Sequence, residues 1–249
     1  VVFMNNRQSK DTLFNTPNEH RSFTFDEQVA TVFDDMINRS VPGYSAIIDM
    51  VGQLAHRYCK NGSIIYDLGC SLGASSLSIT RHIEHNDYEI IAIDNSEAMV
   101  SRLKADLQNQ KGATKQIKVK LEDIRESEIK SASMVILNFT LQFINVKDRD
   151  QLIKKISAGM RPGGLLIISE KVSFTNMEMN SLFIDLYHKF KEKQGYSELE
   201  ISQKRDALEN VLIPESLEKH YERLLAADFE LIETWLKYFN FASIIAFKK

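Results

Sequence analysis

A glycine-containing turn between an apolar run and a helical segment constrains the fold of this chain most strongly. The apolar run is Ile64–Tyr66, the turn is Asp67–Gly73, and helical periodicity begins near Ala74. A strand that enters a helix through such a turn is typical of parallel α/β sheets, where the turn brings backbone N–H groups close to a ligand. The pattern therefore predicts a binding site at the carboxyl end of this strand.

Apolar runs alternate with helical segments along the chain, which predicts a doubly wound α/β fold. The expected strands are 63–67, 89–94, 116–120, 134–137, 165–169, 231–239 and 241–247. The last two runs are joined by almost no connection. Because a parallel crossover needs about a dozen residues or more, these two strands must form an antiparallel hairpin.

The chain is expected to form a single domain with one insertion. Its 249 residues, 43% of them hydrophobic, are enough for one sizeable core. Residues 1–24 are polar and are predicted to be a flexible N-terminal extension, so that the domain spans 25–249. A helical insertion is expected at about 173–212, with its second helix opened by Ser197 and Glu200 at capping-box spacing.

Composition argues against several classes of function. A net charge of −3 gives no general attraction to phosphate backbones, so no direct nucleic-acid partner is expected. Cys59 and Cys70 suggest no disulfide framework, and the six histidines have no metal-ligand spacing, so no metal is expected. No signal-like core and no apolar run of membrane-spanning length is seen, which predicts a cytoplasmic protein without a membrane partner.

The acidic residues near the turn favour a cofactor without phosphates. Asp94 ends the second strand, where a carboxylate can accept both hydroxyls of a ribose. Asp67 precedes the first glycine, and Ser71 stands where a dinucleotide fingerprint has its second glycine. Because an acidic residue repels phosphate but attracts an ammonium group, the turn favours S-adenosylmethionine over NAD.

Three further positions have two interpretations each. Asp123-Ile124, after the third strand, either binds adenine through an acceptor and an apolar surface or forms a surface turn. Asn138, after the fourth strand, either contacts the ligand or caps the next turn. Tyr44, after the Pro42-Gly43 break, either closes over the cofactor or belongs to the core.

Arg205 departs from the pattern of the insertion. Its spacing from Ile201 and Leu208 places it on the apolar stripe of its helix. A cation on a buried stripe is costly unless it is paired, so Arg205 either forms an ion pair or subunit contact or receives the carboxylate of a ligand. The lysines expected on solvated faces are Lys115, Lys118, Lys120, Lys189, Lys191 and Lys193.

From Phe25 to the C-terminus the chain resembles the carboxy-S-adenosyl-L-methionine synthases. That family has a Rossmann-like Class I methyltransferase fold, a seven-stranded mostly parallel sheet that ends in an antiparallel hairpin. The segment Gly195–Arg205, GYSELEISQKR, is long and unusual, which makes the match specific. The other matching segments are Phe25–Glu27, Ser40–Ser45, Tyr66–Gly73, Ala92–Ser96 and Leu137–Phe143.

The resemblance implies that S-adenosylmethionine is a substrate. It implies conversion of S-adenosylmethionine and prephenate to carboxy-S-adenosylmethionine and phenylpyruvate, by a homodimer, and use of the product by a tRNA carboxymethyltransferase for wobble uridine. It implies that Arg205 is the catalytic residue that holds the added carboxylate. The residues it implies along the cofactor are Tyr44, Gly69, Cys70, Ser71, Asp94, Asn95, Asp123, Ile124 and Asn138.

Two other functions remain open on the sequence. One is an ordinary S-adenosylmethionine-dependent methyltransferase acting on tRNA or a small molecule. The other is a non-catalytic S-adenosylmethionine-binding partner of a tRNA-modifying enzyme. Turnover of prephenate separates both from the synthase, because neither alternative consumes it.

Overall fold

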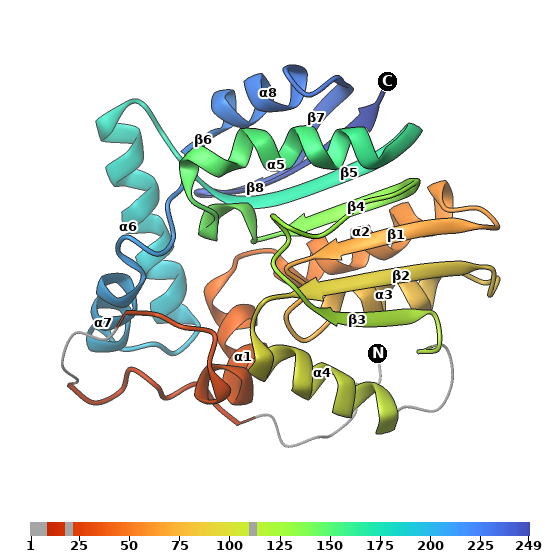
Figure 1. Ribbon diagram of the computed structural model, residues 1–249. Helices are drawn as coiled ribbons and strands as arrows, with labels where there is room; N and C mark the ends of the chain where they lie inside the picture. Colours follow the sequence, from red (N-terminus) through yellow and green to blue (C-terminus); the bar gives the residue numbers. More distant parts are fainter. Residues whose placement is uncertain (1–8, 18–21, 110–113) are drawn as a thin grey trace.

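One mixed sheet organises the computed structural model, which describes residues 9–17, 22–109 and 114–249 (Figure 1). Strands β1 to β5 are parallel, and β8 is antiparallel to its neighbours β5 and β7. This arrangement confirms the predicted fold class; a short strand, β6 (Glu215–Ser216), also pairs with β5. In spatial order the main strands are β3 (Ile117–Leu121), β2 (Tyr88–Asp94), β1 (Ser63–Leu68), β4 (Ala132–Asn138), β5 (Met160–Ser173), β8 (Phe241–Lys248) and β7 (Phe229–Tyr238).

The central strands are apolar throughout because helices cover both faces of the sheet. In β4, Val135 and Leu137 enter one core while Met134 and Ile136 enter the other. This alternation follows from the two-residue period of a strand. Helices α5 (Val146–Gly159) and α8 (Leu217–Leu225) cover the front face in Figure 1, and α2 (Tyr44–Tyr58) and α3 (Ala74–His82) lie behind, with α4 (Glu97–Asn109) beside β3.

The insertion forms two helices beside the carboxyl ends of the parallel strands. Helices α6 (Met177–Lys193) and α7 (Glu198–Leu208) stand at the left of Figure 1, near α1 (Glu27–Ser40). The predicted capping box is confirmed, since Ser197 Oγ accepts from Glu200 N at 3.3 Å and Glu200 Oε2 accepts from Ser197 N at 2.7 Å. Across the described ranges, no helix is both long and apolar enough to cross a bilayer.

The predicted flexible extension is wrong where the structure describes it, at residues 9–17 and 22–24. Asp11 is buried, and its carboxylate accepts a hydrogen bond from Tyr196 Oη at 2.6 Å. Phe23 is also buried, and its backbone N–H donates to Ala207 O at 2.9 Å. The polar composition of the segment gave no sign that the Asp11 carboxylate would have buried partners. Residues 1–8 and 18–21 lie outside the described ranges.

Candidate functional site

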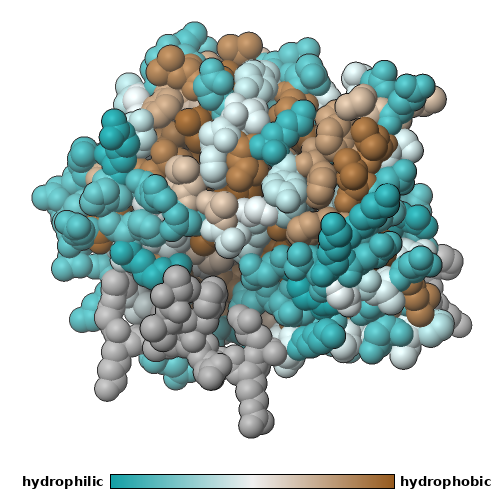
Figure 2. Space-filling view, turned by 180° about the vertical axis from the view of Figure 1, so that it is seen from behind, coloured by the Kyte–Doolittle hydropathy of each residue, from teal (hydrophilic) through white to brown (hydrophobic). Residues whose placement is uncertain are grey.

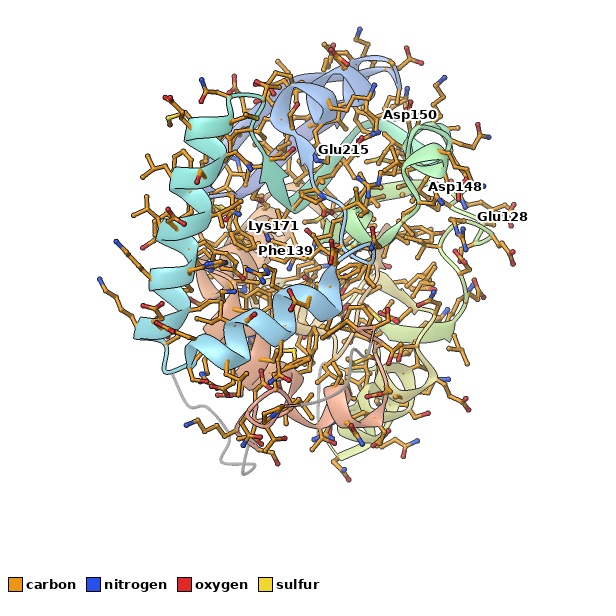
Figure 3. All side chains as sticks on the ribbon, turned by 90° about the vertical axis from the view of Figure 1, so that its left-hand side faces the viewer. Glu128, Phe139, Asp148, Asp150, Lys171 and Glu215 are labelled. Atoms are coloured by element: carbon orange, nitrogen blue, oxygen red, sulfur yellow. The ribbon has the colours of Figure 1, made fainter. Side chains whose placement is uncertain are left out.

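A cavity of about 530 Å³ lies where β1, β4 and β5 end. Residues from the β1 turn, from the loop after β4 and from helices α1, α2, α6 and α7 line it. Figure 3 looks onto this edge of the molecule, and Phe139 and Lys171 lie near its centre, between α6 and the sheet. The cavity is therefore at the edge of the sheet where open α/β folds bind ligands.

The turn after β1 is held against the end of β2 by backbone hydrogen bonds. The N–H groups of Gly69 and Cys70 both donate to Ile93 O, at 2.8 and 3.0 Å. Gly69 and Gly73 have φ of 76°, and Ser71 has φ of 46°, a conformation that non-glycine residues rarely adopt. Such strain is concentrated at functional sites. Gly69, Cys70 and Ser71, three of the residues expected along the cofactor, all line the cavity.

Asp94 lies just behind the turn and organises it. Its carboxylate accepts from the backbone N–H of Ser71 at 2.9 Å and from that of Ser96 at 2.8 Å. Burial raises its pKa, although these hydrogen bonds oppose the shift. Asp94 does not itself line the cavity, but it joins the turn to the start of α4.

Asp67 puts a buried carboxylate in the cavity wall. Its Oδ2 accepts from Ser76 Oγ at 2.6 Å and from Ser76 N at 3.1 Å, in the first turn of α3. Burial raises the pKa of Asp67 to about 6, and these hydrogen bonds from Ser76 only partly offset the effect. No basic side chain of the described residues forms an ion pair with it, so a cationic ligand would be stabilised there.

Three residues expected along the cofactor do not line the cavity: Asn95, and the pair expected around adenine, Asp123 and Ile124. Asn95 is exposed, and Ile124 is buried in the core beneath α5. Asp123 pairs with Arg125 at 2.6 Å, and this guanidinium holds the pKa of Asp123 below its usual range. All three follow β2 or β3 at the same sheet edge as the turn, but the structure does not bring them into the cavity wall.

The loop after β4 brings Asn138 and Phe139 to the cavity. Phe139 has φ of 59° and packs near the rings of Tyr44 and Phe241. Asn138 Oδ1 is buried without a hydrogen-bond partner among the described residues, so it can accept from a ligand. Glu170 secures the loop, because its carboxylate accepts from the backbone N–H groups of residues 140–142 at 2.8–3.2 Å.

Arg205 lies on a different side of α7 from the one predicted. Its side chain is 60% exposed, and its guanidinium contacts Asp206 at 3.0 Å. The buried residues of α7 are Ile201, Lys204 and Ala207. Because successive helical residues are turned by about 100°, Arg205 flanks this face and reaches the cavity from its exposed side.

Three lysines that sequence reasoning did not select also line the cavity. They are Lys171 at the end of β5, Lys191 on α6 and Lys204 on α7. Lys191 is only 5% exposed, so its expected place on a solvated face is wrong. Its spacing could have indicated this position, since Lys191 follows Tyr187 by one helical turn and Tyr187 also lines the cavity.

The cavity therefore has charges of both signs from separate segments. Asp67 on the β1 turn supplies the buried carboxylate, and β5, α6 and α7 supply ammonium and guanidinium groups. Such a cavity suits a cationic ligand next to an anionic one. Among the described residues, no group of three or more histidine, cysteine, aspartate or glutamate side chains is placed to hold a metal ion.

Comparison with curated proteins finds close relatives over nearly the whole chain. A carboxy-S-adenosyl-L-methionine synthase of Actinobacillus pleuropneumoniae serotype 7 (strain AP76) is 53% identical over 241 residues, which is 96% of this chain and 100% of that protein. The one of Vibrio cholerae serotype O1 (strain ATCC 39541 / Classical Ogawa 395 / O395) is 54% identical over 240 residues, 96% of this chain and 97% of that protein. A methyltransferase-domain family model matches residues 65–164.

Solved structures share the fold at low identity. Magnesium protoporphyrin IX methyltransferase from Synechocystis PCC 6803 matches with a TM-score of 0.61 at 14% identity, covering 86% of this chain and 87% of that one. An O-methyltransferase family protein from Burkholderia thailandensis matches with a TM-score of 0.63 at 14% identity, covering 90% of this chain and 61% of that one. At this identity the likeness establishes the architecture and not the reaction.

Proposed function

Because the chain belongs to the carboxy-S-adenosyl-L-methionine synthase family, we propose that its cavity converts S-adenosylmethionine and prephenate to carboxy-S-adenosylmethionine and phenylpyruvate. The observation that carries the proposal is the presence of both charges in one cavity. Asp67 suits the ammonium group of S-adenosylmethionine, and the basic groups of β5, α6 and α7 suit an anionic second substrate such as prephenate. A methyltransferase that acts on a neutral acceptor would not need these basic side chains in its cavity.

The proposed reaction begins with prephenate. Its ring carboxylate leaves as carbon dioxide, the electrons of the broken C–C bond make the ring aromatic, and the ring hydroxyl leaves as hydroxide. Hydroxide removes a proton from the sulfonium methyl group, forming water and an ylide. The ylide carbon then attacks carbon dioxide to form the new carboxylate. The chain's task is to hold the two substrates together and to exclude bulk water, for which α6 and α7 are well placed.

Mass spectrometry of the nucleoside product tests this function. We expect purified protein incubated with S-adenosylmethionine and prephenate to yield a species heavier than S-adenosylmethionine by one carbon dioxide. Formation of S-adenosylhomocysteine and a methylated acceptor would instead indicate an ordinary methyltransferase. Unchanged S-adenosylmethionine and prephenate would indicate a non-catalytic binding partner.

The turn and its surroundings are the proposed S-adenosylmethionine site. Tyr44, Gly69, Cys70, Ser71 and Asn138 line the cavity, which supports their assignment. Asp94 and Asn95 are proposed for the ribose, and Asp123 and Ile124 for adenine, on the strength of their position at the ends of β2 and β3. For Asp123 this requires that its carboxylate contact the ligand while it remains paired with Arg125.

Affinity for S-adenosylmethionine is expected to fall as the pH drops through 6. The pKa of Asp67 is about 6 without ligand, so below that pH its carboxylate is protonated and no longer attracts the ammonium group. We expect the dissociation constant from calorimetry to rise about tenfold between about pH 7 and pH 5. Asp67→Asn should bind more weakly but with little dependence on pH in this range. An unchanged slope in this variant would assign the effect to other groups, such as His188.

Arg205 is the proposed receiver of the added carboxylate. Arg205→Leu should weaken binding of carboxy-S-adenosylmethionine about tenfold or more, because a charge-assisted hydrogen bond is lost. Binding of plain S-adenosylmethionine should change little, because that ligand lacks the carboxylate. Lys189→Leu, on the exposed side of α6, is the control and should alter neither affinity. Equal losses for both ligands in the Arg205 variant would contradict the role.

A homodimer is also proposed, with Arg205 acting within its own subunit or across the interface. Three apolar side chains of α6 are exposed: Met177 at 84%, Met179 at 42% and Leu182 at 48%. Apolar residues also gather on the upper half of the rear face (Figure 2). Such surface suits burial against a second copy. Sedimentation should give twice the mass of 28.6 kDa, whereas a monomer would contradict the proposal.

The product is proposed to leave the enzyme for a separate tRNA carboxymethyltransferase in the cytoplasm. A net charge of −3 supports the proposal that a separate enzyme binds the tRNA, since this chain has no excess of basic residues to bind it. No metal is required by the proposed steps, because hydroxide from prephenate is the base and carbon dioxide is the electrophile.

A further inference from the structure

Two lysines in the cavity, Lys191, which is buried, and Lys171, which is half-buried, have no carboxylate partner among the described residues. Lys191 Nζ lies 4.5 Å from the centre of the Tyr187 ring, and Lys171 Nζ lies 5.2 Å from the same centre. Tyr187 is itself on the cavity wall, and Figure 3 shows Lys171 near the centre of the view. The two ammonium groups therefore approach one ring from different elements, β5 and α6. A ring does not neutralise an ammonium group as a carboxylate does, so both groups can still bind an anion.

The surrounding charges favour an anion at this place. Lys204 is engaged by Ser40 Oγ at 2.9 Å and by Asp11 at 3.6 Å, so its charge is already compensated. Asp206, another wall residue, is taken by Arg205. Lys171 and Lys191 have no comparable neighbour: burial and the nearby cations lower the pKa of Lys191 to about 7, and burial also lowers that of Lys171.

Building on the proposed function, we propose that Lys171 and Lys191 bind the carboxylate that prephenate retains when it becomes phenylpyruvate. The reason is energetic. Ammonium groups that held the departing carboxylate would stabilise the substrate more than the transition state, because that negative charge disappears as carbon dioxide forms. Binding the retained carboxylate anchors the substrate without opposing decarboxylation. Phe139 and Phe241 on the same wall provide an apolar surface for the ring.

Steady-state kinetics of Lys171→Met and Lys191→Met test the proposal. Methionine keeps an unbranched chain and removes the charge, and replacing a charge that has no carboxylate partner should not unfold the domain. We expect the KM for prephenate to rise about tenfold or more in each variant. The dissociation constant of S-adenosylmethionine should stay within about threefold, because its ammonium group is assigned to Asp67. Lys193→Met, exposed on the same helix, is the control and should match the unaltered protein.

Inhibition by phenylpyruvate identifies which carboxylate is bound. Phenylpyruvate has only the retained carboxylate, so its inhibition constant against prephenate should rise in parallel with the KM in both lysine variants. A raised KM with an unchanged inhibition constant would assign the lysines to the departing carboxylate and overturn the proposal. An equal loss of S-adenosylmethionine affinity would assign them to the methionyl carboxylate and would overturn it too.

Failure of this inference is distinguishable from failure of the proposed function. If the unaltered protein forms no carboxy-S-adenosylmethionine from prephenate, the proposed function is wrong. If the unaltered protein is active and both methionine variants keep its KM for prephenate, only the lysine subsite is wrong.

Discussion

Asp94→Ala is expected to weaken S-adenosylmethionine binding at least a hundredfold. If Asp94 binds the ribose as proposed, two hydrogen bonds from ribose hydroxyls to its carboxylate would be lost, at about 1.5–3 kcal/mol each, or about 3–6 kcal/mol together. The substitution also removes the hydrogen bonds that the backbone N–H groups of Ser71 and Ser96 donate to the Asp94 carboxylate, at 2.9 and 2.8 Å. The turn that presents Gly69–Ser71 to the cavity should lose its order as well.

Calorimetric titration of the variant with S-adenosylmethionine measures the effect. Glu89→Ala is a matched control, because Glu89 lies on the same strand but its carboxylate pairs at the surface with Lys118 at 2.8 Å. The control should bind normally, since an exposed ion pair contributes little. Asp94→Asn keeps one acceptor and should fall between the two. An affinity loss of less than about tenfold in Asp94→Ala, at unchanged thermal stability, would remove Asp94 from the ribose site.

Gly69→Ala is expected to destabilise the protein and abolish cofactor binding. Gly69 has φ of 76°, and a Cβ atom there would lie 2.4 Å from both Oγ1 and Cγ2 of Thr140. Thr140 cannot easily turn away, because its Oγ1 donates to Leu68 O at 3.0 Å. The left-handed backbone costs about 1–2 kcal/mol and the clash about 1–3 kcal/mol more. Urea unfolding should therefore show a loss of about 2–5 kcal/mol.

Gly62→Ala separates the two causes. Gly62 has nearly the same φ, 75°, but a Cβ atom there would meet nothing within 4 Å. Gly62→Ala should lower the free energy of unfolding only by the cost of placing alanine in the left-handed conformation, about 1–2 kcal/mol. Cofactor binding should be unaffected. If the two variants are equally destabilised, the contact with Thr140 is not what requires glycine at position 69.

The fold could be predicted from the sequence because its strands, hairpin and helix cap each leave a local signal. The apolar runs of β4 and β5 lack alternation, and such strands are buried on both faces, as the two cores confirm. The final hairpin could be predicted from the length of the connection alone, since the two residues between β7 and β8, 239 and 240, are too few for a parallel crossover. The capping box at Ser197 followed from two residue types at one spacing.

The two cations of α7 show what the sequence pattern could not predict. Arg205 and Lys204 are neighbours on one helix, and the spacing of apolar residues pointed to Arg205 as the buried cation. The structure buries Lys204 instead, because Asp11 from the N-terminal segment and Ser40 from α1 meet its ammonium group. Neither partner is near α7 in sequence, so no local pattern could have chosen between the two residues.

The sequence by itself determined the order of strands and helices, the glycine turn with its acidic residues, and the family of the chain. These depend on neighbouring residues, whose spacing sets which face of a helix or strand they share. Only the tertiary structure decided which cations enter the cavity, because the burial of a charge depends on what packs around it. Lys171, Lys191 and Lys204 come from three separate elements, and they meet only when α6 and α7 lie over the ends of the strands.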